Sequence, residues 1–287
     1  MLFDSHCHFT DPGFDDCRDQ LAEQIRDLGL TIADIGTDLD TSLAALRAAK
    51  QWDFCYAVVG WHPSEVGRLT EELLARTLEL CKEPKVVAVG EIGLDYHWEE
   101  NPPREIQQHW FRRQLQEAVR LGMPVCIHSR DADGDTFQIL KEEVFLKRVP
   151  DPDSAQGSVG PGSPERTVKA SDRTKVLMHC FSGSAELARQ YVKLGAKISL
   201  GGPVTYKNAR HSVNVAEALD IGDLLIETDS PYMAPVPMRG KQNKPTYVQY
   251  VAKRIAEIKG ITYKEAADAT YRNACSFYGI AAEQPRD

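Results

Sequence analysis

The fold is decided by a stretch that runs from residue 86 to residue 128 and reads VVAVGEIGLDYHWEENPPREIQQHWFRRQLQEAVRLGMPVCIH. Its beginning, residues 86–92, is a short, Val-rich apolar run of the kind that forms a buried β-strand. Residues 104–121 then have the apolar spacing of an amphipathic helix. A second apolar run follows at residues 124–128. The stretch therefore predicts a strand, a helix and a second strand in one βαβ unit.

The same alternation recurs along the whole chain. The eight strand candidates are residues 2–8, 31–36, 54–61, 86–92, 124–128, 175–181, 196–200 and 224–228. Between them lie helical candidates at residues 16–28, 41–49, 70–81, 104–121, 186–193 and 212–219. Eight such units are the number that closes a parallel barrel covered by helices on its outside. We predict an α/β fold, a TIM-type (β/α)8 barrel in a single domain over residues 1–287, with an open doubly wound sheet as the alternative.

One segment departs from this alternation. Residues 147–174 hold four Pro, three Gly and four Ser and have no hydrophobic period. Such a composition is typical of a flexible loop. Because the segment lies between a helix and the next strand, we expect a surface insertion at the rim remote from the active face. A lid over the substrate is the alternative.

Composition and charge narrow the possible functions. The 287 residues carry 34 Lys and Arg against 42 Asp and Glu, a net charge of −8, which disfavours a protein that coats nucleic acid through a basic stripe. An enzyme that holds phosphate through bound metal remains possible, because the ions themselves supply positive charge. No apolar run approaches the length of a membrane span, and the seven Cys form no C-x-x-C pair. We expect a cytoplasmic protein with no membrane partner.

Most of the histidines follow one rule of position. Five of the eight lie at or just beyond the C-terminal ends of predicted strands, and two acids lie in the same position. In a parallel barrel these ends meet on one face, where catalytic residues gather. The residues are His6, His8, His62, Glu91, His128, His179 and Asp229.

Six of these side chains form a predicted metal site. His6 and His8 face the same way, because side chains alternate along a strand. So many buried polar groups on one rim require a cation, and six ligands exceed what one tetrahedral ion needs. We predict two divalent ions: one held by His6, His8 and Asp229, the other by His128 and His179, with Glu91 bridging them. Such a pair would activate water at neutral pH, with Asp229 placed to take or relay the proton.

Five ordered motifs carry a resemblance to a known family. They are His6-Cys7-His8, residues 90–96 (GEIGLDY), 124–132 (PVCIHSRDA), 179–183 (HCFSG) and 227–232 (ETDSPY). Together they resemble the TatD family of metal-dependent deoxyribonucleases, within the amidohydrolase-like barrels, from Met1 to about Ile280. The resemblance implies a two-metal site on the six residues above, Mg or Mn as the working ions with Zn possible, and hydrolysis of DNA from a 3′ end. Residues 60–64 and 201–207 depart from the family's pattern beside the predicted cleft and bear on substrate preference.

Side chains around the metals are predicted to contact the substrate. Arg130 would reach a phosphate oxygen, with an ion pair to Asp131 or Asp133 as the alternative. Tyr96 and Trp98 would stack a base, with plain packing as the alternative. The predicted substrate-binding residues are His62, Arg130, Tyr96, Lys207 and Arg239. For His62 the alternative is a role in supporting the metal ligands. For Lys207 and Arg239 the alternative is a role in surface solubility.

These observations predict a metal-dependent hydrolase that cleaves DNA phosphodiester bonds as a 3′–5′ exonuclease, with Asp229 and Glu91 as its catalytic residues. An acidic surface suits binding of a chain end, so DNA single strands or 3′ ends are the expected partners. We expect the protein to be a monomer. The alternative enzyme is an ester or C–N hydrolase, including aminoacyl-tRNA deacylation, at the same binuclear site. A non-catalytic scaffold is the third possibility, but it predicts a broken ligand set, and all six positions are filled.

Overall fold

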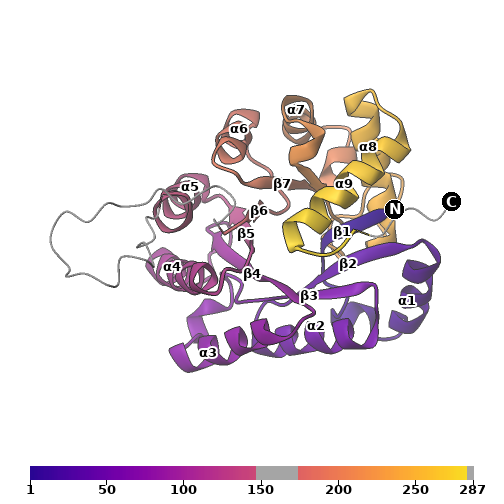
Figure 1. Ribbon diagram of the computed structural model, residues 1–287. Coiled ribbons are helices and arrows are strands. Elements are labelled where there is room, and N and C mark those ends of the chain that lie inside the picture. The colour runs from indigo at the N-terminus through magenta and orange to yellow at the C-terminus, as the bar shows by residue number, and fades with distance from the viewer. Residues whose placement is uncertain (147–173, 283–287) are drawn as a thin grey trace, which may run out of the picture.

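Eight parallel strands form the centre of the molecule (Figure 1). The computed structural model describes residues 1–146 and 174–282, so nearly all of the predicted insertion at 147–174 lies outside the described residues. The strands are β1 (Leu2–Cys7), β2 (Leu30–Ile35), β3 (Cys55–Val59), β4 (Val86–Asp95), β5 (Val125–Arg130), β6 (Val176–Met178), β7 (Lys197–Leu200) and β8 (Leu224–Ile226). Each pairs in parallel with the next in sequence order. The predicted α/β TIM-type barrel is confirmed.

The first and last strands come together just beyond their C-terminal ends. The Asp229 N–H donates to the His6 carbonyl at 2.9 Å, and the His8 N–H donates to the Ser230 carbonyl at 2.8 Å. These bonds join segments more than two hundred residues apart in sequence. They bring the predicted ligands of β1 and of the segment after β8 to the same rim.

Helices surround the strands (Figure 1). They are α1 (Arg18–Asp27), α2 (Leu39–Gln51), α3 (Glu71–Glu79), α4 (Arg104–Leu121), α5 (Asp133–Leu140), α6 (Ala185–Lys193), α7 (Arg210–Ala218), α8 (Val248–Lys259) and α9 (Tyr263–Tyr278). Local chemistry sets several ends: the side chains of Thr70 and Ser184 accept N–H bonds at the starts of α3 and α6. Gly122, at φ +67°, ends α4 in the left-handed conformation that glycine adopts without strain. None of the helices in the described part of the chain has the length and apolar character that a membrane crossing needs.

Strand β4 extends three residues beyond its predicted end. Gly93 (φ +148°) makes this possible, because a Cβ at that position would lie 2.0 Å from the His128 carbonyl oxygen. The glycine lets β4 approach β5 closely and continue to Asp95, where β4 pairs with Arg130 of β5. Since a glycine ordinarily weakens a strand pattern, the sequence alone did not predict the extension.

The barrel interior is packed at one end by α9. Phe3 of β1 lies 5.6 Å from Tyr278 and 6.3 Å from Tyr271 between ring centroids, within a buried cluster that includes Val58 and Leu177. A larger apolar cluster fills the space between the strands and the surrounding helices. With the N-terminal end packed in this way, the C-terminal end remains for polar side chains.

Candidate metal centre

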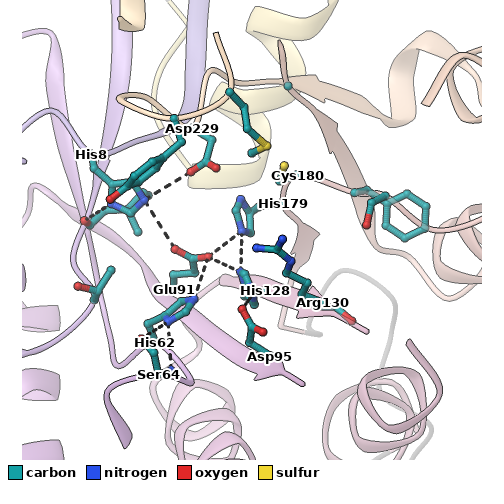
Figure 2. Close-up of a pocket in the computed structure, with 18 of the residues that line it drawn as sticks. His8, His62, Ser64, Glu91, Asp95, His128, Arg130, His179, Cys180 and Asp229 are labelled. Carbon is teal, nitrogen blue, oxygen red and sulfur yellow. Dashed lines mark hydrogen bonds and ion pairs between the residues drawn. The ribbon is translucent and has the colours of Figure 1, made fainter. Parts of the chain in front are cut away.

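Glu91 lies at the centre of the polar cluster (Figure 2). Its Oε1 atom is 2.7 Å from His179 Nε2 and 2.8 Å from His128 Nδ1. Its Oε2 atom is 3.3 Å from His6 Nε2 and 3.9 Å from His8 Nε2. One buried carboxylate therefore contacts imidazoles that come from three different strand ends.

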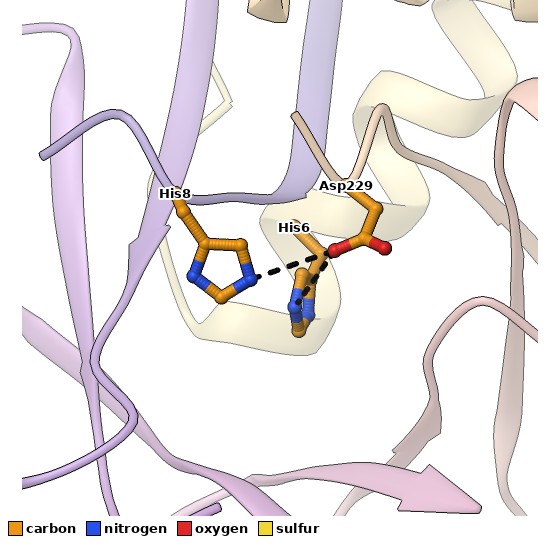
Figure 3. Close-up of side chains that lie close together, drawn as sticks. All are labelled: His6, His8 and Asp229. Atoms are coloured by element: carbon orange, nitrogen blue, oxygen red, sulfur yellow. Dashed lines mark ion pairs between the residues drawn. The ribbon is translucent and has the colours of Figure 1, made fainter. Parts of the chain in front are cut away.

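Asp229 lies beside the two histidines of β1 (Figure 3). Its Oδ1 atom is 3.5 Å from His8 Nε2 and 3.9 Å from His6 Nε2. The backbone next to it is fixed by Asp4, a fully buried acid that accepts the Thr228 N–H at 2.8 Å and the Thr228 hydroxyl. The carboxylate of Asp229 is thus held toward the ring nitrogens of His6 and His8.

Mutual electrostatics sets the charge state of these groups. Burial would raise the pKa of Glu91, but the charges of His179 and His6 outweigh it and hold that pKa well below its usual range. Burial would lower the pKa of His8, but the Asp229 carboxylate outweighs it and raises the pKa to about 9. For His62, burial and the charge of His128 lower the pKa to about 3. The centre therefore combines ionised carboxylates with imidazoles of two kinds: His8 is drawn toward positive charge, whereas the lowered pKa of His62 favours its neutral form.

Several buried atoms of the cluster make no hydrogen bond within the described part of the chain. They are Nδ1 and Nε2 of His6, Nδ1 of His179 and Oε2 of Glu227. Such atoms are costly unless something binds them, and imidazole and carboxylate are common ligands of divalent metals. Among the described residues, three groups place one ligand atom each within 4.8 Å of the others: His6, His8 and Asp229; His62, Glu91 and His128; and His6, His179 and Glu227. The donor set fits bound divalent cations.

A pocket of about 840 Å³ lies over the cluster. Glu91, His128 and Asp229 belong to its lining, together with the guanidinium of Arg130 (Figure 2). The ring of Trp98 also lines it and is 49% exposed. The pocket thus combines a polar centre with an exposed aromatic side chain.

Comparison with known proteins assigns the family. The sequence pattern of the family described as "TatD related DNase" matches residues 3–279. The chain belongs to the TatD family. Membership places it among metal-dependent hydrolases, as the names of its relatives below indicate.

Similar proteins cover this chain almost end to end. A Bacillus subtilis relative named "uncharacterized metal-dependent hydrolase YabD" is 40% identical over 98% of this chain and 100% of its own length. An Escherichia coli K12 relative named "uncharacterized metal-dependent hydrolase YcfH" is 34% identical over 99% of this chain and 98% of its own. Among solved structures, the TatD homologue YJJV of Escherichia coli K12 superimposes with a TM-score of 0.82 at 29% identity, covering 98% of both chains.

The structure brings all six predicted ligands to one rim. They are His6, His8, Glu91, His128, His179 and Asp229. His62, predicted to stand outside the ligand set, lies closer than expected, with Nε2 3.8 Å from Glu91 Oε1. Its Nδ1 atom lies 2.7 Å from the Ser64 hydroxyl. His62 therefore belongs to a possible ligand group as well as to the pocket lining.

The predicted substrate-binding residues divide into two sets. His62 and Arg130 line the pocket, whereas Tyr96, Lys207 and Arg239 are not among its lining residues. The Tyr96 hydroxyl donates to Asp135 at 2.8 Å, and the Arg104 guanidinium lies 4.3 Å from its ring centroid. Arg239 lies over the ring of Tyr206 at 4.5 Å. Contacts within the protein thus engage Tyr96 and Arg239, and contact of Tyr96, Lys207 and Arg239 with substrate stays a prediction.

Arg130 does not form the carboxylate pair weighed as its alternative. Within residues 1–146 and 174–282, Asp131 pairs with His97 at 2.8 Å, and Asp133 lies near the Ser129 hydroxyl. The guanidinium of Arg130 lies 5.2 Å from the ring centroid of Trp98. It faces the pocket next to an exposed aromatic ring.

Sequence reasoning missed three residues of the site. Asp95 and Glu227 contact His128 and His179, and Tyr232 lines the pocket with 55% of its surface exposed. A signal for Asp95 was available, because it follows Glu91 by four positions and so shares its strand face. Glu227 precedes Asp229 by two positions in the same way. Nothing in the hydrophobic pattern marked Tyr232, which follows the last strand in a loop.

Proposed function

We propose that this TatD-family protein hydrolyses phosphodiester bonds at the 3′ ends of single-stranded DNA, with two divalent cations as cofactors. The observation that carries the proposal is the convergence of four imidazoles and two acids, Glu91 and Asp229, on the floor of an open pocket. Within the family, this donor set supports metal-assisted attack on an ester. The open pocket above it suits a chain end.

The ligand groups suggest how the cations are shared. His6, His8 and Asp229 would hold one, and His128 and His179, which both lie beside Glu91 Oε1, would hold the other, while Glu91 Oε2 lies beside His6. When bound, such cations lower the pKa of water and neutralise charge on the phosphate. Mg or Mn is the proposed working ion, because both accept carboxylate and water ligands.

Asp229 acts as the proton acceptor at the wall of the pocket. Burial would raise its pKa, but the hydrogen bond with His8 and the charges of His179 and His6 outweigh burial and lower it. An ionised carboxylate accepts a proton from an attacking water and passes it on as the bond breaks. The turn held by Asp4 and Thr228 keeps this acid in place.

Arg130 binds the phosphate from the opposite side of the pocket from His8 (Figure 2). Its planar guanidinium donates paired hydrogen bonds to anionic oxygens. It meets no carboxylate among the described residues, so these donors remain for substrate.

Trp98 and Tyr232 provide surfaces for the bases. Trp98 lies next to Arg130, whereas Tyr232 lies edge-on to His8, with ring centroids 6.1 Å apart. Aromatic stacking tolerates any base, as an exonuclease needs. A net charge of −8 also favours local contacts with a chain end over an extended basic track along duplex DNA.

A substrate panel tests the reaction. Wild-type protein with Mg²⁺ or Mn²⁺ is expected to release mononucleotides stepwise from a 5′-labelled single-stranded oligonucleotide. The variant Glu91→Gln is expected to lose at least about 100-fold in rate, because it removes the carboxylate shared by both ligand groups. Glu186→Gln, at an exposed acid of α6, serves as the matched control and retains the wild-type rate.

Two results would contradict the proposal. One is hydrolysis of acyl esters, amides or aminoacyl-tRNA by a preparation that leaves the oligonucleotide intact. The other is full activity of Glu91→Gln on DNA.

A further inference from the structure

Asp95 is a buried carboxylate that none of the predicted ligand groups uses. It ends β4 and is 3% exposed. Its Oδ2 atom lies 3.1 Å from Nε2 of His128 (Figure 2). Among the described residues, no group of potential metal ligands includes Asp95. Its chemistry therefore concerns His128 rather than a cation directly.

The two nitrogens of His128 face two different carboxylates. Nδ1 faces the cluster, 2.8 Å from Glu91 Oε1 and 3.3 Å from His179 Nε2, while Nε2 faces Asp95. A carboxylate at Nε2 accepts the ring N–H there. The lone pair of Nδ1 is then directed into the cluster, where a cation ligand must present it.

Asp95 itself is held firmly. Its Oδ1 atom accepts the His97 N–H at 3.0 Å. Its own N–H donates to Gln107 Oε1, and its carbonyl accepts from Gln107 Nε2, both at 2.9 Å. The amide of Asn101 donates to the same carbonyl at 3.1 Å. A carboxylate fixed at both its backbone and its second oxygen can fix the ring that it contacts.

The histidines of the other ligand group lack such a partner. Nδ1 of His8 contacts a neutral backbone carbonyl, that of Ile35, at 3.1 Å. Nδ1 of His6 makes no hydrogen bond at all. Among the described residues, a carboxylate thus faces the second ring nitrogen, the one turned away from Glu91, at His128 and at His179, where Glu227 lies 3.4 Å from Nδ1. The two halves of the centre are supported by different chemistry.

We infer that Asp95 is a positioning residue that fixes the ring of His128 and thereby sets the affinity of the cation on the His128 side alone. The inference rests on the proposed pair of cations and is independent of whether DNA is the substrate. The cation held by His6, His8 and Asp229 does not depend on Asp95.

Metal titration of the full-length protein tests this role without any activity assay. Protein stripped by a chelator and dialysed is titrated with Mn²⁺ by calorimetry, and the bound ions are followed by electron paramagnetic resonance. Wild type is expected to bind two ions that give a spin-coupled signal. Asp95→Ala is expected to bind one ion with unchanged affinity and the other about 10- to 100-fold more weakly.

Two further variants sharpen the result. Asp95→Asn keeps the size and a neutral acceptor and should lose less affinity than Asp95→Ala; it decides the matter if thermal unfolding shows that the alanine variant does not fold. Asp131→Asn is the matched control, because Asp131 contacts His97 at 2.8 Å outside the cluster. It should bind both ions as wild type does.

A double variant separates positioning from direct ligation. In a His128→Ala background, removal of Asp95 should cause no additional loss, because its partner is already absent. A further loss in that background would overturn the inference, as would wild-type binding by both Asp95 variants or equal weakening of the two ions. A wild-type stoichiometry of one would overturn both the inference and the proposed pair of cations. Two ions without nuclease activity would contradict only the proposed substrate.

Discussion

Asp34 is a fully buried acid of β2 whose surroundings offer few hydrogen bonds to offset the cost of burying its charge. Its Oδ1 atom accepts the Thr10 N–H at 3.2 Å, and its Oδ2 atom makes no hydrogen bond to the described residues. Burial outweighs the hydrogen bonds of Thr10 and the charge of His8, and raises its pKa to about 6. Because the pKa of an unfolded Asp is about 3.9, the folded chain binds the proton more tightly. Ionisation of Asp34 therefore destabilises the fold as the pH rises from about 4 to 6.

The variant Asp34→Asn removes this ionisation. Relative to wild type, its free energy of unfolding should increase by about 2 kcal/mol between pH 4.5 and pH 8, since wild type loses stability over that interval and the amide does not. Chemical denaturation of chelator-treated protein at the two pH values measures the difference. Asp16→Asn, at an exposed acid, should show no such change. A difference between Asp34→Asn and wild type that is the same at both pH values would refute this explanation.

The predicted metal ligands are placed by their positions along strands, whereas the missed residues are placed by packing or by the path of a loop. His6, His8 and Glu91 were predictable because strand position and alternation fix where such side chains point. Asp95 was missed because the expected strand stopped short of it at Gly93, whose close approach to His128 is a property of packing. The contacts of Tyr96 with Asp135 and Arg104 were not predicted for a similar reason, because they depend on the path of a loop.

At the scale of elements, α9 closes the barrel interior. The Tyr278 hydroxyl donates to the Ser5 carbonyl at 2.6 Å and lies 3.4 Å from Cys126 Sγ. The helix starts with a capping box between Thr262 and Glu265 and ends at Gly279. It follows the eighth strand by more than thirty residues and stands outside the strand–helix alternation, so the repeating pattern did not predict it.

The contact of Tyr278 with β1 should be measurable. Tyr278→Phe keeps the packing of the ring but removes the hydroxyl group that donates a hydrogen bond to the Ser5 carbonyl. The buried carbonyl then loses its donor, and the free energy of unfolding should fall by about 1–3 kcal/mol. Urea denaturation measures it, with Tyr263→Phe, at a 45% exposed ring of the same helix, as the control. Equal stability of Tyr278→Phe and wild type would show that the bond contributes nothing.

At the scale of the whole molecule, closure of the barrel creates the site. The bond from the Asp229 N–H to the His6 carbonyl joins the two ends of the sheet and places Asp229 beside His6, which in turn lies beside Glu91. The barrel and its ligand face were predictable, because a period of alternating elements determines which strand ends meet. The positions of Tyr232 and Trp98 in the pocket lining were not predictable, because both residues lie in loops whose paths the alternation of strands and helices does not determine. The single-domain organisation over residues 1–287 stays a prediction.

The central claim is that paired cations bind around Glu91 at the C-terminal rim of the barrel. Crystals soaked in Mn²⁺ and measured at a wavelength where manganese scatters anomalously would locate the ions directly. The predicted result is two peaks, one beside His6, His8 and Asp229 and one beside His128 and His179, with Glu91 between them. Peaks elsewhere, or none at this rim while the protein turns over substrate, would contradict the claim.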